Sequence, residues 1–312
     1  MTLRTILVTG APGFVGRALM PVLRQAFPHA DIRDAAVDVT DPAAVTATIA
    51  EARPDALVHL AAVAAPGDAR ADPDRAWRVN LHGSLAIGRA IMAEAPACTM
   101  LFVSSADAYG ASFRAGVPLD EGAALAPLGT YGATKAAADL ALGAMAAEGL
   151  RVIRARPFNH TGPGQSDTFV VPAFARQVAR IAAGLQDPVM DVGALHPLRD
   201  FLDVRDVCAA YAAILAHADA LAPGTILNIA SGRTQRIGDI LQNLLDAAGV
   251  TAEIRTQPAK LRPTDVAAAS GDAALAHRLL GWQPTIPWRQ TLEDVLADWT
   301  ARQPASDTQA GA

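Results

Sequence analysis

The 312-residue chain contains almost no lysine, since 24 of its 26 basic residues are arginine and only Lys135 and Lys260 are lysine. Cysteine is equally rare, and the two present, Cys98 and Cys208, lie too far apart to form a metal-binding motif. We therefore expect two buried free thiols, no metal site and a cytoplasmic location, where thiols stay reduced.

Positive charge and long apolar segments are also missing. The net charge of −5 argues against general affinity for nucleic acid or an anionic membrane surface. No apolar run reaches the roughly 18 residues that a membrane span needs, and residues 1–16 contain no secretory signal. Because 51% of the residues are hydrophobic, we expect a soluble protein with a sizeable core, no nucleic-acid or membrane partner, and a flexible tail at 303–312.

A glycine-rich turn follows the first apolar segment. Residues 5–9 (TILVT) predict a short strand, and residues 10–16 (GAPGFVG) a loop that opens a helix. Gly10 would permit the tight turn, Gly13 the approach of a pyrophosphate, and Gly16 close packing of the helix on the strand. The helix N-terminus would then face the phosphates. This order of elements predicts a dinucleotide site.

Strands and helices alternate through the first half of the chain. Strands are expected at 56–61, 99–105 and 151–156, and helices at 42–52, 73–95 and 130–149. This rhythm predicts an α/β fold with a doubly wound parallel (Rossmann) sheet. Ligands of such sheets bind beyond the carboxyl ends of the strands. The residues expected at those ends are Gly10, Ala61, Ala62, Ser104, Ser105, Pro157, Phe158 and Asn159.

The second strand is poorly defined, with both Arg33 and Asp34 where a ribose-reading residue is expected. An acid there favours NAD, whereas an arginine favours the 2′-phosphate of NADP. The cofactor therefore stays open between NAD(H) and NADP(H). Asp38 could accept a hydrogen bond from the adenine amino group, or it could cap the local loop or helix with Thr40 and Asp41.

Tyr131 and Lys135 share one face of the helix expected over 130–149, with Cβ atoms about 5–6 Å apart. An ammonium at roughly 4 Å from the phenol would stabilise the phenolate by up to ~4 kcal/mol. Lys135 would thereby lower the pKa of Tyr131 toward neutrality. The alternative is an ordinary pair on a helix surface.

Several motifs together resemble the extended short-chain dehydrogenase/reductase family of nucleotide-sugar enzymes, over residues 4–299. They are TGAPGFVG (9–16), HLAA (59–62), Asn80, SSADAYG (104–110) and YGATK (131–135). The resemblance implies a catalytic triad of Ser105, Tyr131 and Lys135, in which Tyr131 exchanges a proton with the sugar oxygen as hydride moves at the adjacent carbon. Asp107 is a further catalytic candidate, because related dehydratases carry Glu at its position.

The same resemblance implies cofactor contacts from the glycine loop, the strand ends and the catalytic helix. The residues are Gly10, Pro12, Gly13, Phe14, Val15, Gly16, Asp38, Val39, Leu60, Ala61, Ala62, Asn80, Ser104, Tyr131, Lys135, Pro157, Asn159 and His160. For His160 a structural hydrogen bond is as well supported as catalysis, so we do not assign it as an acid or base.

Later segments resemble the branch of the family that reduces GDP-4-keto-6-deoxy-hexoses. They are RPFNHTGPGQ (156–165), VVPAFARQ (170–177), RDFLDVRDV (199–207), NIASGR (228–233) and LRPTDV (261–266). The resemblance implies an NAD(P)-dependent oxidoreductase that reduces the 4-keto group, of the type that converts GDP-4-dehydro-6-deoxy-D-mannose to GDP-D-rhamnose. It places the nucleotide sugar against Ser105, Asn159, Val171, Arg176, Arg199, Arg262 and Asp265.

The family also implies how the chain is organised. Residues 1–157 plus 199–230 would form the dinucleotide-binding Rossmann domain. Residues 158–198 plus 231–300 would form a smaller, interleaved C-terminal α/β substrate domain. The helices near 73–95 and 130–149 resemble those that join relatives into a homodimer through a four-helix bundle.

Three other functions remain open. A GDP-mannose 4,6-dehydratase or a nucleotide-sugar 4-epimerase would share the triad, although Asp107 is shorter than the dehydratase Glu and Ala106 adds no polar group. A non-catalytic NAD(P)-sensing protein is a more distant alternative, because such proteins commonly lose the Tyr–Lys pair that this chain retains.

Overall fold

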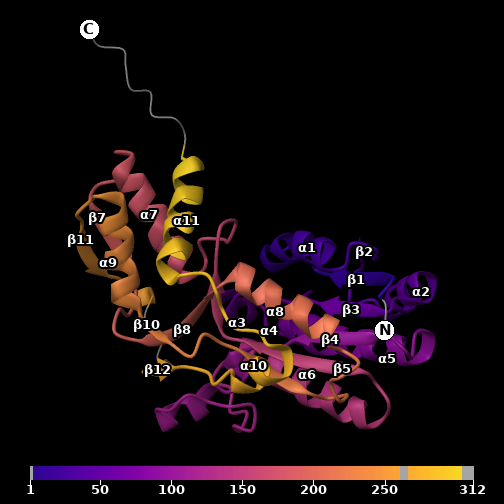
Figure 1. Ribbon diagram of the computed structural model, residues 1–312. Helices are drawn as coiled ribbons and strands as arrows, with labels where there is room; N and C mark the ends of the chain where they lie inside the picture. The colour runs from indigo at the N-terminus through magenta and orange to yellow at the C-terminus, as the bar shows by residue number, and fades with distance from the viewer. Residues whose placement is uncertain (1–2, 261–265, 304–312) are drawn as a thin grey trace.

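The computed structural model describes residues 3–260 and 266–303, and Figure 1 shows their arrangement. Its largest element is a six-stranded sheet in the order β2-β1-β3-β4-β5-β9. Every neighbouring pair in this sheet is parallel. The strands are β1 (Thr5–Thr9), β2 (Asp31–Asp34), β3 (Ala56–His59), β4 (Thr99–Val103), β5 (Val152–Pro157) and β9 (Ile226–Ile229).

The strand order reverses between β1 and β3, which confirms the predicted doubly wound sheet. The chain first adds β2 on one side of β1 and then builds outward from β3 on the other side. Ligands of such sheets bind beyond the carboxyl ends of the strands at this point of reversal, which here lies between β1 and β3. β2 is the short edge strand of the sheet.

Helices cover both faces of the sheet, so the central strands β1, β3 and β4 are largely buried on both sides. Ile6 and Val8 pack with α1 (Phe14–Ala26) and α8 (Val204–Ala216), whereas Leu7 faces the opposite cluster. That second cluster includes residues of α2 (Pro42–Ala52), α5 (Ser84–Glu94) and α6 (Thr130–Ala147).

The helix expected over 73–95 is interrupted. The structure has α3 (Pro66–Ala71), α4 (Pro73–Trp77), a π-helical turn η1 (Arg78–Gly83) and then α5. Asn80 in this turn is buried, and its side chain bonds Val63 and Thr134. The wider turn gives Asn80 this orientation, as π-turns often do for functional side chains.

A second group of elements lies to one side of the large sheet, where Figure 1 shows α7, α9 and α11 together. These helices share one hydrophobic core, which also contains Met190 and Val192 of β7. Smaller strands adjoin it: β8 pairs with β10, β12 and β6, and β7 pairs with β11. The bounds are β6 (Asn159–Thr161), α7 (Val170–Ala182), β7 (Val189–Val192), β8 (Leu198–Asp203), β10 (Thr234–Arg236), α9 (Ile237–Ala248), β11 (Glu253–Thr256), β12 (Ala268–Ala269), α10 (Ala274–Leu280) and α11 (Trp288–Ala301).

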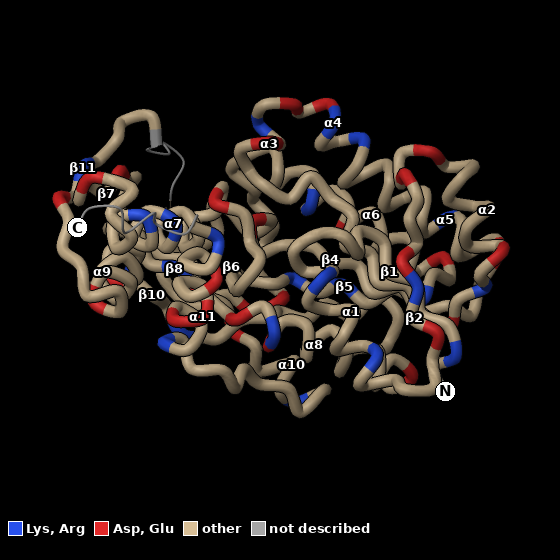
Figure 2. Tube along the Cα trace, turned by 90° about the horizontal axis from the view of Figure 1, so that it is seen from above, with Lys and Arg blue, Asp and Glu red and all other residues tan. Residues whose placement is uncertain are grey.

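Charged positions lie mostly on outer loops and helices, as Figure 2 shows, with some basic positions in the middle beside β5. No helix among the described residues is long and apolar enough to cross a membrane. Cys98 and Cys208 are buried and free, as expected, and burial raises the pKa of each thiol to about 12.

His59, the last residue of β3, joins three elements. Its Nδ1 lies 2.7 Å from the Thr9 Oγ1 of β1, and its Nε2 lies 3.0 Å from the Ser84 Oγ of α5. Burial, with a smaller contribution from Lys135, lowers the pKa of His59 to about 3. The folded protein therefore keeps this ring neutral at pH values where the unfolded chain protonates it.

We predict that His59 makes the protein sensitive to acid. Between pH 6.5 and 3 the unfolded state binds the extra proton, so the free energy of unfolding falls with pH by up to ~1.4 kcal/mol per unit. Urea unfolding at several pH values should give a flatter pH dependence for His59→Gln than for the wild type. His217→Gln, on an exposed helix end, is the control. Equal slopes in all three proteins would contradict the prediction.

Candidate active site

The glycine loop between β1 and α1 is built so that no side chain fills it. Gly10 has a φ of +73°, and a Cβ there would lie 2.8 Å from the Ala61 nitrogen. A Cβ on Gly13 would lie 3.1 Å from the Gly10 oxygen, and one on Gly16 would overlap the Ala11 backbone. In the described structure no side chain caps α1, so its first amides are available to an anion. This cradle fits a dinucleotide pyrophosphate.

The neighbours of these glycines connect the loop to a distant segment. The Phe14 ring stacks on His160, with centroids 6.4 Å apart. Arg17 donates to the Pro12 oxygen at 2.6 Å and to the Gly164 oxygen at 3.0 Å. Val15 accepts a weak bond from the Cys208 thiol at 3.9 Å. Sequence reasoning missed this bridging role of Arg17, although the residue directly follows the last glycine.

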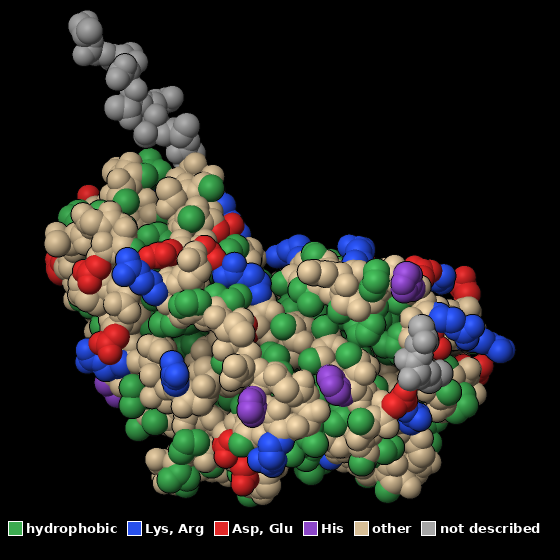
Figure 3. Space-filling view, in the orientation of Figure 1, with side chains coloured by type: hydrophobic (Ala, Val, Ile, Leu, Met, Phe, Trp, Pro, Cys, Tyr) green, Lys and Arg blue, Asp and Glu red, His purple; other side chains and the backbone are tan. Residues whose placement is uncertain are grey.

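The parallel strands bring most of the expected residues to one edge of the sheet. Leu60, Ala61 and Ala62 follow β3, with Ala61 against Gly10. Ser104 and Ser105 follow β4, and Pro157 ends β5. Figure 3 shows the upper surface hollowed between the part with α7 and α11 and the part with α1, with basic side chains on both sides.

The residues near the second strand are engaged with one another. Asp38 accepts from the Thr40 nitrogen and Oγ1, at 2.9 and 2.7 Å, which matches the capping alternative. The Thr40 backbone and side-chain bonds lower the pKa of Asp38. Val39 is buried and would meet a Cβ on Gly83. Arg33 is bound to Asp31 at 2.6 Å and Asp34 accepts from the Ala36 nitrogen at 3.0 Å.

Asn80, an expected cofactor contact, is enclosed by protein. Its Oδ1 accepts from the Val63 nitrogen at 2.8 Å, and its Nδ2 donates to the Val63 oxygen and to the Thr134 Oγ1. It thereby links the loop after β3 to the catalytic helix α6. These bonds make its observed role structural.

Tyr131 is the second residue of α6 and lies beside Ser105. Burial and the charge of Asp107 raise the pKa of Tyr131, and a hydrogen bond from the Ser105 side chain opposes them. Asp107 is exposed, and its own backbone nitrogen donates to the Ser105 Oγ at 3.1 Å. The phenol is therefore protonated at neutral pH.

The Lys135 ammonium is bonded at the end of strand β4. It donates to the Val103 oxygen, at 2.6 Å, and lies 5.1 Å from the centre of the Phe102 ring. Burial lowers the pKa of Lys135 to about 8, against the charge of Asp139. The expectation that Lys135 depresses the pKa of Tyr131 is thus wrong for this structure, because the strand-end carbonyl attracts the ammonium and burial dominates at the phenol.

Residues expected at the sugar nucleotide are spread over several elements. Asn159 begins β6 and is exposed. His160 has its Nδ1 2.9 Å from the Phe158 oxygen, and burial lowers its pKa, so the ring is neutral. Arg199 in β8 donates to the Leu198 and Val266 oxygens at 2.8 and 2.9 Å. Val171 faces the core of α7, α9 and α11. Arg262 and Asp265 lie outside the described residues.

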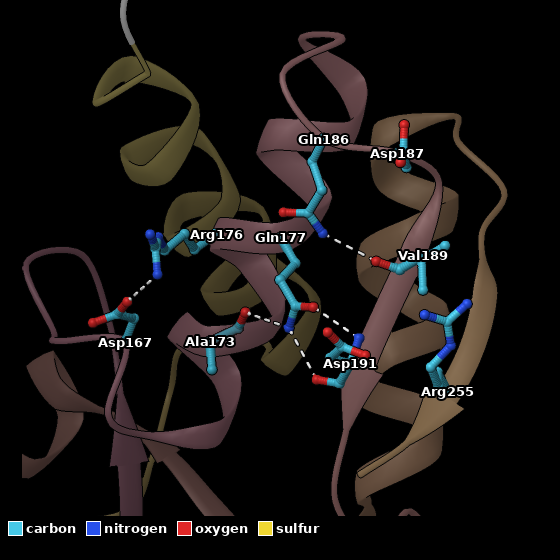
Figure 4. Close-up of a pocket in the computed structure, with 9 residues that line it drawn as sticks. All are labelled: Asp167, Ala173, Arg176, Gln177, Gln186, Asp187, Val189, Asp191 and Arg255. Carbon is cyan, nitrogen blue, oxygen red and sulfur yellow. Dashed lines mark hydrogen bonds and ion pairs between the residues drawn. The ribbon is translucent and has the colours of Figure 1, made fainter.

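Arg176 lies on a separate groove of about 430 Å³, between α7 and β7 (Figure 4). It pairs with Asp167 at 2.7 Å. Gln177 crosses the floor, accepting from the Asp191 nitrogen at 2.9 Å and donating to the Asp191 and Ala173 oxygens. Of the residues expected at the sugar nucleotide, Arg176 alone lines this groove within the described part of the chain.

The described residues hold no cluster of three or more His, Cys, Asp or Glu side chains suited to a metal. What the rim does bring together is a glycine cradle, a serine hydroxyl, a protonated phenol and a buried ammonium. This combination defines a dinucleotide-binding enzyme of the Rossmann type.

Comparison with known proteins gives the family. Residues 6–230 match the NAD dependent epimerase/dehydratase family. The chain is 38% identical to GDP-6-deoxy-D-mannose reductase of Pseudomonas aeruginosa, over 95% of this chain and 97% of that protein. It is 26% identical to UDP-glucose 4-epimerase of Neisseria gonorrhoeae, over 96% and 98%. The structure of RMD from Pseudomonas aeruginosa complexed with NADPH superposes with a TM-score of 0.88 at 36% identity, covering 96% of this chain and 100% of that one. The chain belongs to the NAD dependent epimerase/dehydratase family.

Gly10→Ala tests the cradle. The substitution places a Cβ against Ala61 in a left-handed conformation, which should lower the free energy of unfolding by about 1–3 kcal/mol. Binding of NADPH, followed by its fluorescence, should weaken at least ~10-fold, a loss of about 1.4 kcal/mol.

Gly67→Ala in α3 is the matched control, because a Cβ there meets nothing within 4 Å. Its NADPH affinity should equal that of the wild type, and its free energy of unfolding should be equal or higher by up to about 1 kcal/mol, because alanine favours a helix more than glycine does. If Gly10→Ala behaved like this control, the glycine loop would not be the cradle described above.

Proposed function

We propose that the protein reduces the 4-keto group of a GDP-4-keto-6-deoxy-hexose, as in the conversion of GDP-4-dehydro-6-deoxy-D-mannose to GDP-D-rhamnose. The observation that carries the proposal is the Ser105–Tyr131–Lys135 constellation, set at the rim of the glycine cradle. It occurs in a chain that is 38% identical, over 95% of its length, to GDP-6-deoxy-D-mannose reductase. The glycine loop with Gly10, Gly13 and Gly16 would hold NADPH or NADH, which would supply the hydride when bound.

The direction of the reaction suits the protonation states of the site. A ketone that accepts hydride at carbon needs a proton at oxygen, and the raised pKa of Tyr131 keeps a proton on the phenol for that step. Ser105, bonded to the same phenol, donates to the developing alkoxide. Lys135, charged at neutral pH, would stabilise negative charge at the site and hold the ribose of the cofactor. Asp107 contributes to the same step, because its charge raises the pKa of Tyr131.

The nucleotide sugar would occupy the space between the rim and the group of elements around α7. Asn159 and Arg199 supply polar contacts, with Arg262 and Asp265 from the segment outside the described residues. Val171 acts by packing the start of α7. Arg176 lines the separate groove between α7 and β7, so its contact with this ligand stays a prediction. His160, stacked on Phe14, joins the cofactor loop to this space. An arginine fork binds a diphosphate well, which offsets the net charge of −5.

The division of the chain and its assembly are part of the proposal. Residues 1–157 plus 199–230 form the dinucleotide-binding domain, and 158–198 plus 231–300 the substrate domain. The core that α7, α9 and α11 share supports this division. Two contacts cross it, because Phe201 joins that core and Ala276, Leu280 and Trp282 pack in the core around β1. A homodimer through a four-helix bundle would use α5 and α6, and Leu140 on α6, 60% exposed, supports it. Two buried free thiols fit a cytoplasmic protein.

The direct test measures the absorbance of NADPH or NADH at 340 nm while the protein is incubated with GDP-4-keto-6-deoxymannose or, separately, with GDP-mannose. The reductase consumes one reduced cofactor per keto sugar and leaves GDP-mannose unchanged. Formation of keto sugar from GDP-mannose would identify a dehydratase, and inversion at C4 without net cofactor oxidation would identify an epimerase. Binding of cofactor with no turnover of any of these sugars would leave a sensing protein.

Tyr131→Phe should lower turnover by ~10²–10⁴-fold, because it removes the proton donor, while the dissociation constant for NADPH stays near the wild-type value. Tyr211→Phe is the matched control: its hydroxyl is buried and, in the described structure, has no hydrogen-bond partner. Near-normal turnover in Tyr131→Phe would refute the proton-transfer role.

A further inference from the structure

One buried carboxylate connects the catalytic helix to the neighbouring strand. Asp139 lies on α6, one turn beyond Lys135, and is fully buried. Arg156 of β5 holds it with two bonds of 2.9 Å, from Nε to Oδ2 and from Nη2 to Oδ1. Arg154 of β5 adds a third bond of 2.9 Å to Oδ1. Both arginines belong to β5, and Figure 2 shows basic positions beside that strand.

Both arginines have further acceptors, which fixes the geometry. Arg154 also donates to the Asp139 and Gly224 oxygens, at 3.0 and 2.7 Å. Arg156 donates to the Tyr109 hydroxyl at 3.1 Å, and that hydroxyl donates to Asn228 of β9 at 2.8 Å. The carboxylate therefore cannot turn without breaking its bonds to two arginines of β5.

Asp139 is one of several ionisable groups near the buried Lys135 ammonium. Residues four apart on a helix lie side by side, with Cβ atoms about 5–6 Å apart. Burial lowers the pKa of Lys135 to about 8 and Asp139 opposes that effect. The ionisable groups of this region are Tyr131 and Asp139 on α6, His59 on β3, Asp107 after β4, and Arg154 and Arg156 on β5.

Among these described groups, Asp139 is the one buried side chain that carries a negative charge. His59 and Tyr131 are neutral at pH 7, because burial lowers the pKa of the first and raises that of the second. Asp107 is exposed to solvent, so water screens its charge. Burial favours a neutral carboxyl at Asp139, but Arg156 and Arg154 outweigh it and lower the pKa of Asp139, which stays ionised.

We propose that Asp139 is a positioning residue for the reaction: it keeps the buried Lys135 ammonium in its charged form and fixes the face of α6 that carries Tyr131 and Lys135 against β5. The inference rests on the proposed function for its catalytic meaning. The arginines orient the carboxylate, and the carboxylate offsets the desolvation of the ammonium one turn away. Asp139 itself touches neither substrate nor cofactor.

The scarcity of lysine allows a test that needs no turnover. Protein labelled with ¹³C at the lysine Cε gives two signals, from Lys135 and Lys260, and Lys260→Arg assigns them. The Lys135 signal is titrated in the wild type, Asp139→Asn, Asp139→Glu and Arg154→Gln. The wild-type midpoint is expected near pH 8.

Asp139→Asn should lower the midpoint by at least one unit, a tenfold loss in proton affinity, and Asp139→Glu should restore most of it. Arg154→Gln should raise the midpoint, because it removes a cation that competes for the carboxylate. An unchanged midpoint in folded Asp139→Asn would overturn the inference. If Asp139→Asn does not fold, Arg154→Gln decides: a rise supports the inference, and no change or a fall overturns it.

Asp206→Asn is the matched control, because Asp206 is a buried carboxylate on α8 bonded to Thr285 and Ile286. It should lose stability without moving the Lys135 midpoint, and an equal shift there would also overturn the inference.

In the 340 nm assay, Asp139→Asn should lose kcat increasingly as pH rises from 6 to 8, at an unchanged KM for NADPH. Absence of turnover in the wild type would refute the proposed function. The titration of Lys135 would still test the role of Asp139, because it does not depend on turnover.

Discussion

The three bonds between Asp139 and the arginines of β5 are the interaction on which the site depends. They join the helix that carries Tyr131 and Lys135 to the strand that leads into Asn159 and His160. A buried ion pair is weak evidence for stability, since removing both charges from water offsets much of their attraction. The contribution of this ion pair is to fix geometry. Apolar contacts alone would allow α6 to shift along the sheet, whereas the two parallel bonds from the Arg156 guanidinium hold the helix in one position.

The direction of the strands then determines where the chemistry lies. With six parallel strands, every strand ends at the same edge, so the glycine cradle, Ser105 and the end of β5 become neighbours although they are far apart in sequence. The loop that follows β5 returns to the cradle through Phe14, His160 and the bridge from Arg17 to Gly164. Gly164 in turn donates to Asp298 of α11 at 2.9 Å, so this loop also ties the cofactor side to the C-terminal helices.

Much of this architecture could be predicted from the sequence, and the failures share a cause. The strand at 5–9, the helix at 42–52 and the glycine loop follow from local patterns, and the structure confirms them. The π-turn at 78–83 could not be predicted, because the buried contacts of Asn80 with Val63 and Thr134 accompany it. The direction of Lys135 depends on a carbonyl 32 residues away, and Asp139 finds its partners 15 and 17 residues away. Local spacing brings Tyr131 and Lys135 to one face of a helix, but only packing decides what each side chain faces.

Hydride transfer to the keto carbon, completed by a proton from Tyr131, is the central claim, and isotope transfer tests it most directly. The enzyme would be given GDP-4-keto-6-deoxymannose with NADPH that carries deuterium at C4 of the nicotinamide, in each of the two configurations. One configuration should deliver a single deuterium to C4 of the hexose, seen as one added mass unit and by NMR at that carbon, and the other should deliver none. A product that carries no deuterium from either cofactor, or carries it at another carbon, would contradict the proposed reaction.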